Sequence, residues 1–300
     1  MLRGMVEGPR SRETDCPVCG ATARQQLYQV RGYRIVECVA CTHGYVETMP
    51  TESELAALYS ETAESFLGSG LAGPMAEYLG DRDERYFAFH ADRLAELARA
   101  GASAETRIFD FGCSQGALLA TLVKKGYRDV MGFDRSVSAA AEGRARWNLD
   151  IATGDFSDVL AKHEGTFDIV HAANVLEHVI DPKAVLVDLK RLLATSGRLV
   201  VSVPNTRSLQ VRLVGTRSPV IDPPHHLQYY GPKSFERLVC SAGFSVIHVA
   251  TDFWSPASDL YMHMKGVPLW MGRAVRHGMM VPGFGINALK LGGIISLLAQ

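Results

Sequence analysis

The sequence lacks an excess of charge of either sign, and it lacks a long uninterrupted hydrophobic run. Its 31 basic and 32 acidic residues nearly cancel, so no overall field attracts nucleic acid or a membrane surface. The opening "MLRGMVEGPRSRET" has no apolar segment of the kind a secretory signal requires. The most apolar stretch, residues 278–300, is interrupted by Pro282 and Lys290, and a membrane-spanning helix needs roughly 20 predominantly apolar residues. We therefore expect a cytoplasmic protein without a transmembrane segment or a nucleic-acid partner.

Cysteine is scarce, and its distribution excludes the disulfide framework of a small secreted domain. Four of the six cysteines form two Cys-x-x-Cys pairs, namely Cys16, Cys19, Cys38 and Cys41. This spacing is typical of a structural zinc site, in which four thiolates complete a tetrahedral shell and leave no open position. The sequence therefore predicts a zinc ribbon over residues 1–50. His43 could compete as a ligand, but four cysteines already suffice. A redox Cys-x-x-Cys is a weaker alternative because the βαβ context is missing.

The segment "FDFGCSQGALL", residues 109–119, lacks the second glycine of the dinucleotide-binding fingerprint. Ser114 stands where that loop would bring its backbone against a pyrophosphate. Gly112 permits the turn from strand to helix, and Gly116 permits a close approach of the two elements. The spacing favours a cofactor without phosphates and disfavours a dinucleotide oxidoreductase.

From residue 105 onward, apolar strand patterns alternate with helix patterns, which predicts an α/β fold with a parallel sheet covered on both faces. Strands are expected at 107–112, 129–134, 167–174, 197–204, 244–253 and 292–300, and helices at 115–126, 136–147, 181–197 and 231–243. Residues 51–104 open on a capping box, Thr51 to Glu54, and contain a second helix pattern near 82–101. We expect this stretch to form a helical linker or lid, with Gly- and Ser-rich residues 60–80 mobile.

Acidic residues follow three successive strands of this α/β unit. Asp134 can accept hydrogen bonds from both hydroxyls of a ribose, as the acidic residue at this point does in nucleotide folds. Asp155, beside Phe156, can receive an adenine amino group, and Asp110 faces the amino-acid end of the cofactor.

Several motifs now resemble those of the class I S-adenosylmethionine-dependent methyltransferases, over roughly residues 105–300. "DFGCSQG", "GFDRS" and "GDF" resemble the first three motifs of that family, and "FDIVHAANVLEHVIDP" resembles its fourth-strand signature. "LLATSGRLVVSVPN" is similar to a motif that usually reads L-x-P-G-G, with Thr195 and Ser196 in place of Pro-Gly. "HHLQYYGPKSFERLVCSAGF" is similar to the segment before the sixth strand. A four-cysteine ribbon ahead of such a domain resembles a subgroup that methylates sugars, glycans and other small metabolites.

The resemblance implies a Rossmann-like, mostly parallel seven-stranded sheet whose last strand, within 292–300, is antiparallel. It implies S-adenosyl-L-methionine as the cofactor and a small-molecule or glycan acceptor as the partner. The implied cofactor residues are Asp110, Gly112 and Gly116 at the methionine end, Asp134 at the ribose, Asp155 and Phe156 at the adenine, and Asn174 beside the sulfonium.

Methyl transfer to a hydroxyl benefits from a general base, for which histidine is the usual choice near pH 7. The candidates are His178, His225 and His226. A structural role for His178, holding the loop, is as well supported as a catalytic one. Of His225 and His226 we expect one to be structural, and we favour His226 as the base. Some relatives bind a divalent metal through Glu-x-x-Glu-His, but Asn174 replaces the first glutamate here. That replacement argues against a catalytic metal.

The leading hypothesis is an enzyme that O-methylates a hydroxyl of a sugar, glycan or secondary metabolite. A C-methyltransferase acting on a nucleotide-linked sugar is the first alternative. A non-catalytic, methyltransferase-like binding protein is the second, although the intact Asp110, Gly112, Gly116 and Asp134 argue against it. Of the remaining candidates, Cys113, Cys240, Tyr229 and Tyr230 are expected to pack in the core.

Overall fold

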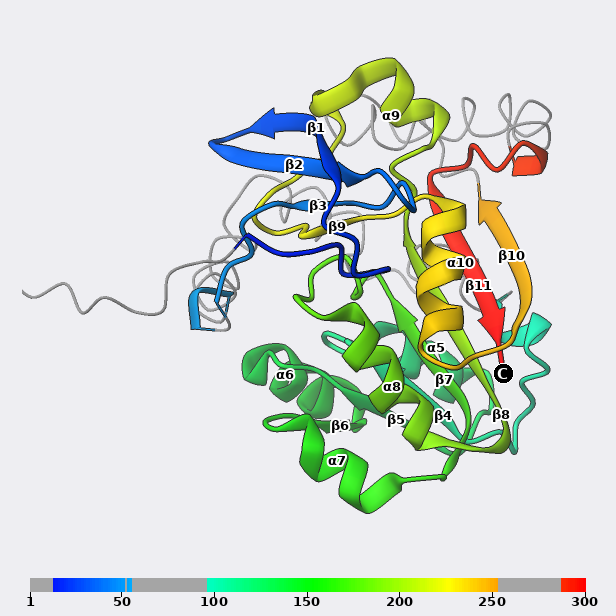
Figure 1. Ribbon diagram of the computed structural model, residues 1–300. Coiled ribbons are helices and arrows are strands. Elements are labelled where there is room, and N and C mark those ends of the chain that lie inside the picture. The colour runs from blue at the N-terminus through cyan, green and yellow to red at the C-terminus, as the bar shows by residue number, and fades with distance from the viewer. Residues whose placement is uncertain (1–12, 52, 56–95, 253–286) are drawn as a thin grey trace, which may run out of the picture.

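The computed structural model describes residues 13–51, 53–55, 96–252 and 287–300 (Figure 1). The predicted mobile segment at 60–80 lies outside the described residues, as does most of the predicted helix at 82–101, of which residues 96–99 are helical. The predicted capping box is confirmed. The Thr51 N–H donates to Glu54 Oε2 at 2.7 Å, and the Glu54 N–H donates to Thr51 Oγ1 at 3.2 Å.

A seven-stranded sheet runs in the order β10-β11-β8-β7-β4-β5-β6. Its strands are β4 (Ile108–Phe111), β5 (Val130–Phe133), β6 (Asp150–Ala152), β7 (Phe167–Ala173), β8 (Leu193–Pro204), β10 (Val246–Asp252) and β11 (Ile294–Ala299). Strands β4 to β8 pair in parallel, whereas β11 is antiparallel to both of its neighbours. The predicted sheet and its antiparallel last strand are therefore confirmed.

Helices cover both faces of this sheet because successive side chains of each strand point to opposite sides. On one face, Phe109 of β4 belongs to a buried cluster with residues of α7 (Phe156–His163), α8 (Pro182–Leu192) and α10 (Pro232–Ser241). On the other face, Ile108 packs with Leu118 and Leu122 of α5 (Ala117–Lys124), and α6 (Val137–Trp147) adds Ala140 beside α5.

Helix α8 ends at Leu192, five residues before the predicted end, and β8 starts at Leu193. Leu193 has extended backbone angles and pairs with Phe167 of β7. The Pro-Gly turn usual at this point is replaced by Thr195 and Ser196, and neither residue stops a strand as proline does. The segment therefore runs straight into β8.

Helix α7 has no counterpart among the predicted elements. Asp155 caps it, since its Oδ1 accepts the Ser157 N–H at 2.9 Å. Val159 and Leu160 are buried on its inner face. The signals in the sequence were an N-cap aspartate and apolar residues at helical spacing.

A second, four-stranded antiparallel sheet lies above the carboxyl edge of the large one (Figure 1). Its strands are β1 (Arg24–Val30), β2 (Tyr33–Cys38), β3 (Gly44–Val46) and β9 (Gln228–Tyr229), paired in that order. The predicted hairpin between β1 and β2 is confirmed, with Arg31 and Gly32 at positive φ in the turn. Strand β9 comes from the distant part of the chain, after β8, α9 (Leu209–Val214) and a short 3-10 helix (Gly215–Arg217).

The two sheets share one buried core. Ile35 and Tyr45 of the small sheet belong to the same apolar cluster as Tyr230 and Phe235. Both Tyr229 and Tyr230 are buried, as predicted, whereas Cys240 is exposed. The prediction for Cys240 is wrong because the inner face of α10 is occupied by other residues, Phe235, Leu238 and Val239.

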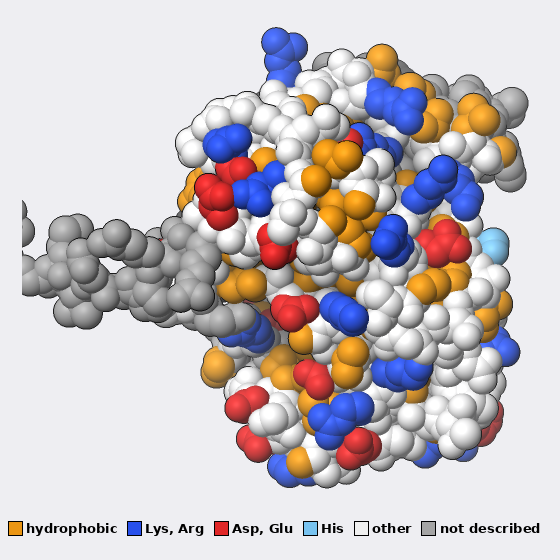
Figure 2. Space-filling model, viewed as in Figure 1, with side chains coloured by type: hydrophobic (Ala, Val, Ile, Leu, Met, Phe, Trp, Pro, Cys, Tyr) orange, Lys and Arg blue, Asp and Glu red, His pale blue; other side chains and the backbone are white. Residues whose placement is uncertain are grey.

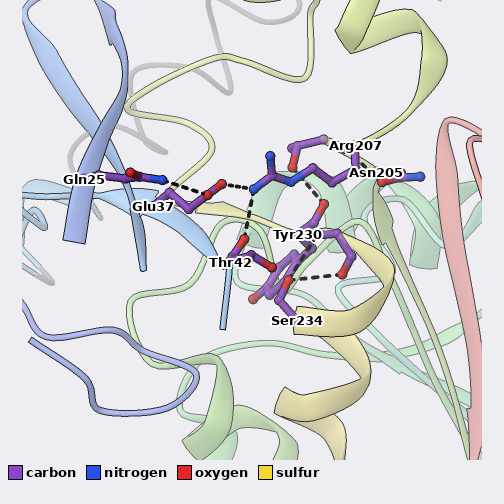
Figure 3. A network of polar contacts seen from close by, with 9 residues as sticks. Gln25, Glu37, Thr42, Asn205, Arg207, Tyr230 and Ser234 are labelled. Atoms are coloured by element: carbon purple, nitrogen blue, oxygen red, sulfur yellow. Dashed lines mark hydrogen bonds and ion pairs between the residues drawn. The ribbon is translucent and has the colours of Figure 1, made fainter. Parts of the chain in front are cut away.

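Arg207 connects the small sheet to the large domain through polar contacts (Figure 3). Its guanidinium pairs with Glu37 of β2, and it donates to the Thr42 carbonyl at 3.1 Å. Its own backbone N–H is held by Asn205 Oδ1 at 2.9 Å, and the neighbouring Thr206 N–H donates to the Tyr230 carbonyl. Burial lowers the pKa of Arg207, although Glu37 and the carbonyl satisfy its charge. The domain boundary predicted at residue 50 stays a prediction. The contacts of Arg207 with Glu37 and Thr42 join residues on its two sides.

The exterior carries no obvious patch of one charge on the face seen in Figure 2, where basic and acidic side chains are interspersed. Within the described ranges, none of the helices combines the length and the apolar character needed to cross a membrane.

Candidate active site and four-cysteine centre

The four cysteines of the two Cys-x-x-Cys pairs meet at one point near the end of β2, whose last residue is Cys38. Their sulfurs all lie within 4.8 Å of one another. Cys16 Sγ is 3.5 Å from Cys41 Sγ, and Cys19 Sγ is 3.5 Å from Cys38 Sγ. These distances exclude disulfides, whose S–S bond is about 2.05 Å. They fit four thiolates about 2.3 Å from one tetrahedral ion. The cluster is therefore consistent with the predicted zinc site.

Each cysteine pair is followed by a residue at positive φ, Gly20 after the first pair and Thr42 after the second. The Gly20 N–H donates to the Cys16 carbonyl and the Thr42 N–H to the Cys38 carbonyl, so both pairs form tight turns. Burial raises the pKa of the Cys41 thiol to about 11. A coordinating cation offsets such an increase, because it binds the deprotonated thiolate.

His43 is not part of the metal-binding group. Its side chain is fully buried, and its Nε2 lies 2.9 Å from Gln228 Oε1. The expectation that four cysteines suffice without His43 agrees with this contact, which directs Nε2 of His43 to β9.

The predicted cofactor loop lies at the switch point of the large sheet. The chain proceeds from β4 outwards through β5 and β6, then returns to place β7 on the other side of β4. In open α/β sheets, ligands bind in the crevice at the carboxyl ends of the strands that flank such a point. Gly112 follows β4, Asp134 follows β5, and Asn174 follows β7.

The glycines of this loop are required by the backbone. Gly112 has φ 74°, and a Cβ there would lie 2.4 Å from Val175 Cγ2. Gly116 has φ 77°, and its Cβ would lie 2.5 Å from Leu149 Cδ1. Ser114 also adopts a positive φ, of 52°. The backbone therefore forms a close turn in which side chains at the two glycine positions would clash.

Asp134 is partly engaged by this loop. Its Oδ2 accepts the Ser114 N–H at 2.6 Å, and its Oδ1 accepts the Ser136 N–H at 2.8 Å. A carboxylate can accept about four hydrogen bonds, so each oxygen retains capacity for one hydroxyl. Burial raises the pKa of Asp134, and the two N–H groups oppose that increase. The geometry fits a group that would hold a ribose.

The side chain of Asp110 is more deeply buried than expected for a residue that faces the cofactor. Its side chain is buried within β4, and its Oδ1 lies 2.8 Å from Nδ1 of the buried His171 on β7. His171 Nε2 is 3.9 Å from Glu96 Oε2, and Glu96 Oε1 accepts a hydrogen bond from Ser296. A buried polar chain thus links four separate segments. The role of Asp110 towards the cofactor stays a prediction.

The remaining cofactor candidates lie around the same edge. Asn174 is exposed and has φ 54°, a conformation that asparagine tolerates. Asp155 is exposed at the start of α7. The ring of Phe156 lies 4.8 Å from that of Phe111 and 5.0 Å from that of Phe133. Packing alone accounts for Phe156, so its adenine role also stays a prediction.

Two of the three candidate histidines are brought together. The rings of His178 and His226 lie 4.8 Å apart. His178 Nδ1 donates to the His225 carbonyl at 2.7 Å, and His226 Nδ1 donates to the Val220 carbonyl at 2.9 Å. The side chain of His225 instead turns to Asp222, with Nδ1 3.1 Å from Oδ2. The structure therefore separates His225 from the other two.

Burial fixes the protonation state of this pair. It lowers the pKa of His178 to about 3, with the neighbouring His226 contributing, and it lowers the pKa of His226 as well. Both rings are therefore neutral near pH 7. Because Nδ1 carries the hydrogen in each, the lone pair lies on Nε2.

Buried Glu177 completes this cluster, with its Oε1 3.7 Å from His178 Nε2. Ligand atoms of Glu177, His178 and His226 lie within 4.8 Å of one another, so this set could hold a metal ion. It differs from the Glu-x-x-Glu-His pattern, because Asn174 is not a member. His171 and Gln228 were not among the predicted site residues. Both lie within motif-like segments, but their partners Asp110 and His43 are 61 and 185 residues away in the chain.

A Rossmann-like sheet with a glycine turn and an acidic residue after its second strand defines the class of proteins that bind a cofactor with a nucleoside part. The sequence pattern of the methyltransferase domain family matches residues 78–249, which is more than half of the chain. The chain belongs to this family, whose methyl donor is S-adenosylmethionine.

Two curated relatives are similar over part of the chain. An uncharacterized 37.1 kDa protein in transposon TN4556 of Streptomyces fradiae is 34% identical over 119 residues, which cover 38% of this chain and 33% of that protein. The chain thus spans only a third of that relative. The ubiquinone biosynthesis O-methyltransferase of Psychrobacter arcticus is 26% identical over 195 residues, which cover 61% of this chain and 74% of the relative.

Solved structures agree on the fold. The magnesium protoporphyrin IX methyltransferase of Synechocystis PCC 6803, solved with bound SAH, has a TM-score of 0.51 at 16% identity, over 80% of this chain and 98% of that one. A SAM dependent methyltransferase of Archaeoglobus fulgidus has a TM-score of 0.50 at 17% identity, over 75% and 96%. At these identities the likeness concerns the fold.

Proposed function

We propose that the chain is an O-methyltransferase that transfers a methyl group from S-adenosylmethionine to a hydroxyl of a sugar, glycan or secondary metabolite. One observation carries the proposal: a loop that fits the cofactor and a neutral histidine pair lie at the same carboxyl edge. The similarity to a ubiquinone biosynthesis O-methyltransferase supports oxygen as the acceptor atom.

On the cofactor side, the turn at Gly112 and Gly116 would admit the methionine end, with Asp110 behind it. Asp134 would accept two ribose hydroxyls with the capacity that Ser114 and Ser136 leave. Asp155 and Phe156 would flank the adenine, and Asn174 would lie beside the sulfonium. When bound, S-adenosylmethionine supplies a methyl group on an already activated sulfur, so the protein mainly aligns the reactants.

On the acceptor side, a neutral histidine Nε2 would accept the hydroxyl proton as the acceptor oxygen attacks the methyl carbon. His178 and His226 are the candidates, because both rings are neutral near pH 7 with the hydrogen on Nδ1. Burial lowers the pKa of His178 to about 3, which makes its Nε2 a weak proton acceptor. His225 would contribute through its carbonyl, which fixes the His178 ring. We also propose a structural Zn²⁺ at the four cysteines, a helical linker over 51–104 between the ribbon and the catalytic domain, and a cytoplasmic location.

The test is direct. Isothermal titration calorimetry should show binding of S-adenosylmethionine, and a panel of hydroxylated acceptors with methyl-labelled cofactor should yield a labelled product. Absence of heat would refute the enzyme and favour a non-catalytic binding protein. A product whose new methyl group is attached to carbon, as read by NMR, would refute O-methylation and favour the C-methyltransferase alternative.

A further inference from the structure

One buried histidine outside the candidate site connects the four-cysteine centre to the histidine pair. His43 lies two residues after Cys41, and its side chain is fully buried. Its ring centroid is 4.9 Å from that of Tyr230 and 6.0 Å from that of Tyr45. A buried polar ring is costly unless it is hydrogen-bonded, so its partner indicates its role.

The partner is Gln228 on β9, whose amide orientation is fixed from the other side. Gln228 Nε2 donates to the Val179 carbonyl at 3.0 Å and to the Ile180 carbonyl at 3.3 Å. Its Oε1 therefore faces His43, and His43 Nε2 must carry the hydrogen in the 2.9 Å contact. The side chain of Gln228 thus bridges the ribbon and the loop after β7.

The backbone around Gln228 holds the same loop. The Leu227 and Gln228 N–H groups both donate to the Glu177 carbonyl, at 2.7 and 3.0 Å. The Tyr230 hydroxyl donates to the Leu176 carbonyl at 3.0 Å. Residues 176–180 are therefore fixed by residues 227–230.

Strand β3 in turn fixes β9. Gly44 pairs with Tyr229, Tyr45 pairs with Gln228, and the Val46 N–H donates to the Leu227 carbonyl at 3.0 Å. Arg31 in the β1–β2 turn also pairs with Asp222, which contacts the His225 ring. The ribbon therefore contacts the segment of His225 and His226 at both ends.

From these contacts we propose that His43 is a positioning residue, which acts through Gln228 to fix the backbone that carries His178 and His226. The four-cysteine ribbon would thereby set the geometry of the acceptor side, because its second cysteine pair ends two residues before His43. The inference rests on the proposed function, since it assigns the base to that histidine pair.

A matched pair of variants tests the proposal. His43→Phe keeps an aromatic ring between Tyr45 and Tyr230 but removes the donor to Gln228. His43→Gln restores a donor near the position of Nε2. Metal content and thermal unfolding are measured first for the full chain, so that loss of the ribbon itself is recognised.

The readout needs no acceptor. In His43→Phe, amide hydrogen exchange in peptides covering 176–180 and 225–230 should become about tenfold faster, as loss of one buried hydrogen bond would produce. Peptides covering 108–134 should be unchanged. The imidazole ¹⁵N signals of His178 and His226 should shift, and His43→Gln should return both readouts towards the native values.

Unchanged exchange in His43→Phe with the metal retained would overturn the proposal. Loss of the metal from His43→Phe would also overturn it, by assigning His43 to the cysteine centre. Failure of His43→Gln to restore either readout would reduce His43 to a packing residue. If no variant, nor the native chain, binds S-adenosylmethionine, the proposed function fails, while the exchange pattern still decides whether His43 positions the loop.

Discussion

The two sheets of this molecule are held together in different ways. The seven-stranded sheet buries apolar side chains under helices on both of its faces, and its parallel strands β4 to β8 follow one another closely in the chain. The four-stranded sheet has little core of its own. It depends on four cysteines, on a shared core with Tyr229 and Tyr230, and on one strand borrowed from the large domain. The small sheet is therefore sensitive to changes in two places, its four-cysteine centre and β9.

Metal removal should have the largest effect. Structural zinc contributes about 10 kcal/mol or more to the folding of small zinc domains, so a strong chelator, or Cys38→Ser, should abolish the four-stranded sheet. Hydrogen exchange should rise over residues 13–49 and at β9, while β4, β5 and β7 stay protected. A metal assay near zero on freshly purified protein would contradict the zinc site.

Asp134→Ala should weaken binding of S-adenosylmethionine by about 1.5–3 kcal/mol, because it removes hydrogen bonds to a charged acceptor. Calorimetry measures the change, and the ribbon's metal content should not alter. Asp150→Ala, at an exposed position in β6, is the control. Unchanged affinity in Asp134→Ala would remove Asp134 from the ribose site.

Gly44→Ala tests the pairing between β3 of the small sheet and β9, the strand contributed by the large domain. A Cβ there would lie 2.9 Å from Tyr229 Cβ and 3.3 Å from the Tyr229 carbonyl oxygen, so β3 and β9 must separate. Overpacking of this kind costs about 1–3 kcal/mol, which a shift in the urea midpoint reports. Val39→Ala, at an exposed ribbon site, should leave the midpoint in place, and an equal shift there would refute the explanation.

Acidification should destabilise the histidine pair. Burial lowers the pKa of folded His178 to about 3 from its ordinary 6.5, so the unfolded chain binds the proton more tightly between these values. The free energy of unfolding should fall as the pH drops below about 6.5, by about 1 kcal/mol per pH unit for this residue. His178→Asn keeps an N–H for the His225 carbonyl and should reduce that slope. An unchanged slope would show that the pKa of folded His178 is not lowered.

The same contrast explains what could be predicted from the sequence. Strands such as β4 and β5 are short apolar runs next to a glycine turn or an acidic residue, so local pattern is sufficient. The cysteine pairs carry their spacing in the sequence. Strand β9 consists of only Gln228 and Tyr229. The motif-like segment around it does not indicate its pairing with β3, which lies far away in the chain.

The residues of the candidate site also divide into those that lie in local motifs and those whose contacts come from distant parts of the chain. Gly112, Gly116 and Asp134 lie in local motifs, and their places at the sheet edge follow from strand order. The pairing of Asp110 with His171 was missed because it joins neighbouring strands that are 61 residues apart in sequence. The separation of His225 from His226 depends on Asp222 and Val220, in an irregular segment without periodicity.

The borrowed strand also has a consequence for how the chain is made. His43 and Gln228 are 185 residues apart in sequence, and synthesis proceeds from the N-terminus. The cysteine turns and the first hairpin therefore leave the ribosome long before β9 exists. Until then, β3 presents an unpaired edge, and the ring of His43 has no amide to bind. The growing chain can bring its four cysteines together early, yet it can complete the ribbon only when most of the large domain has been synthesised.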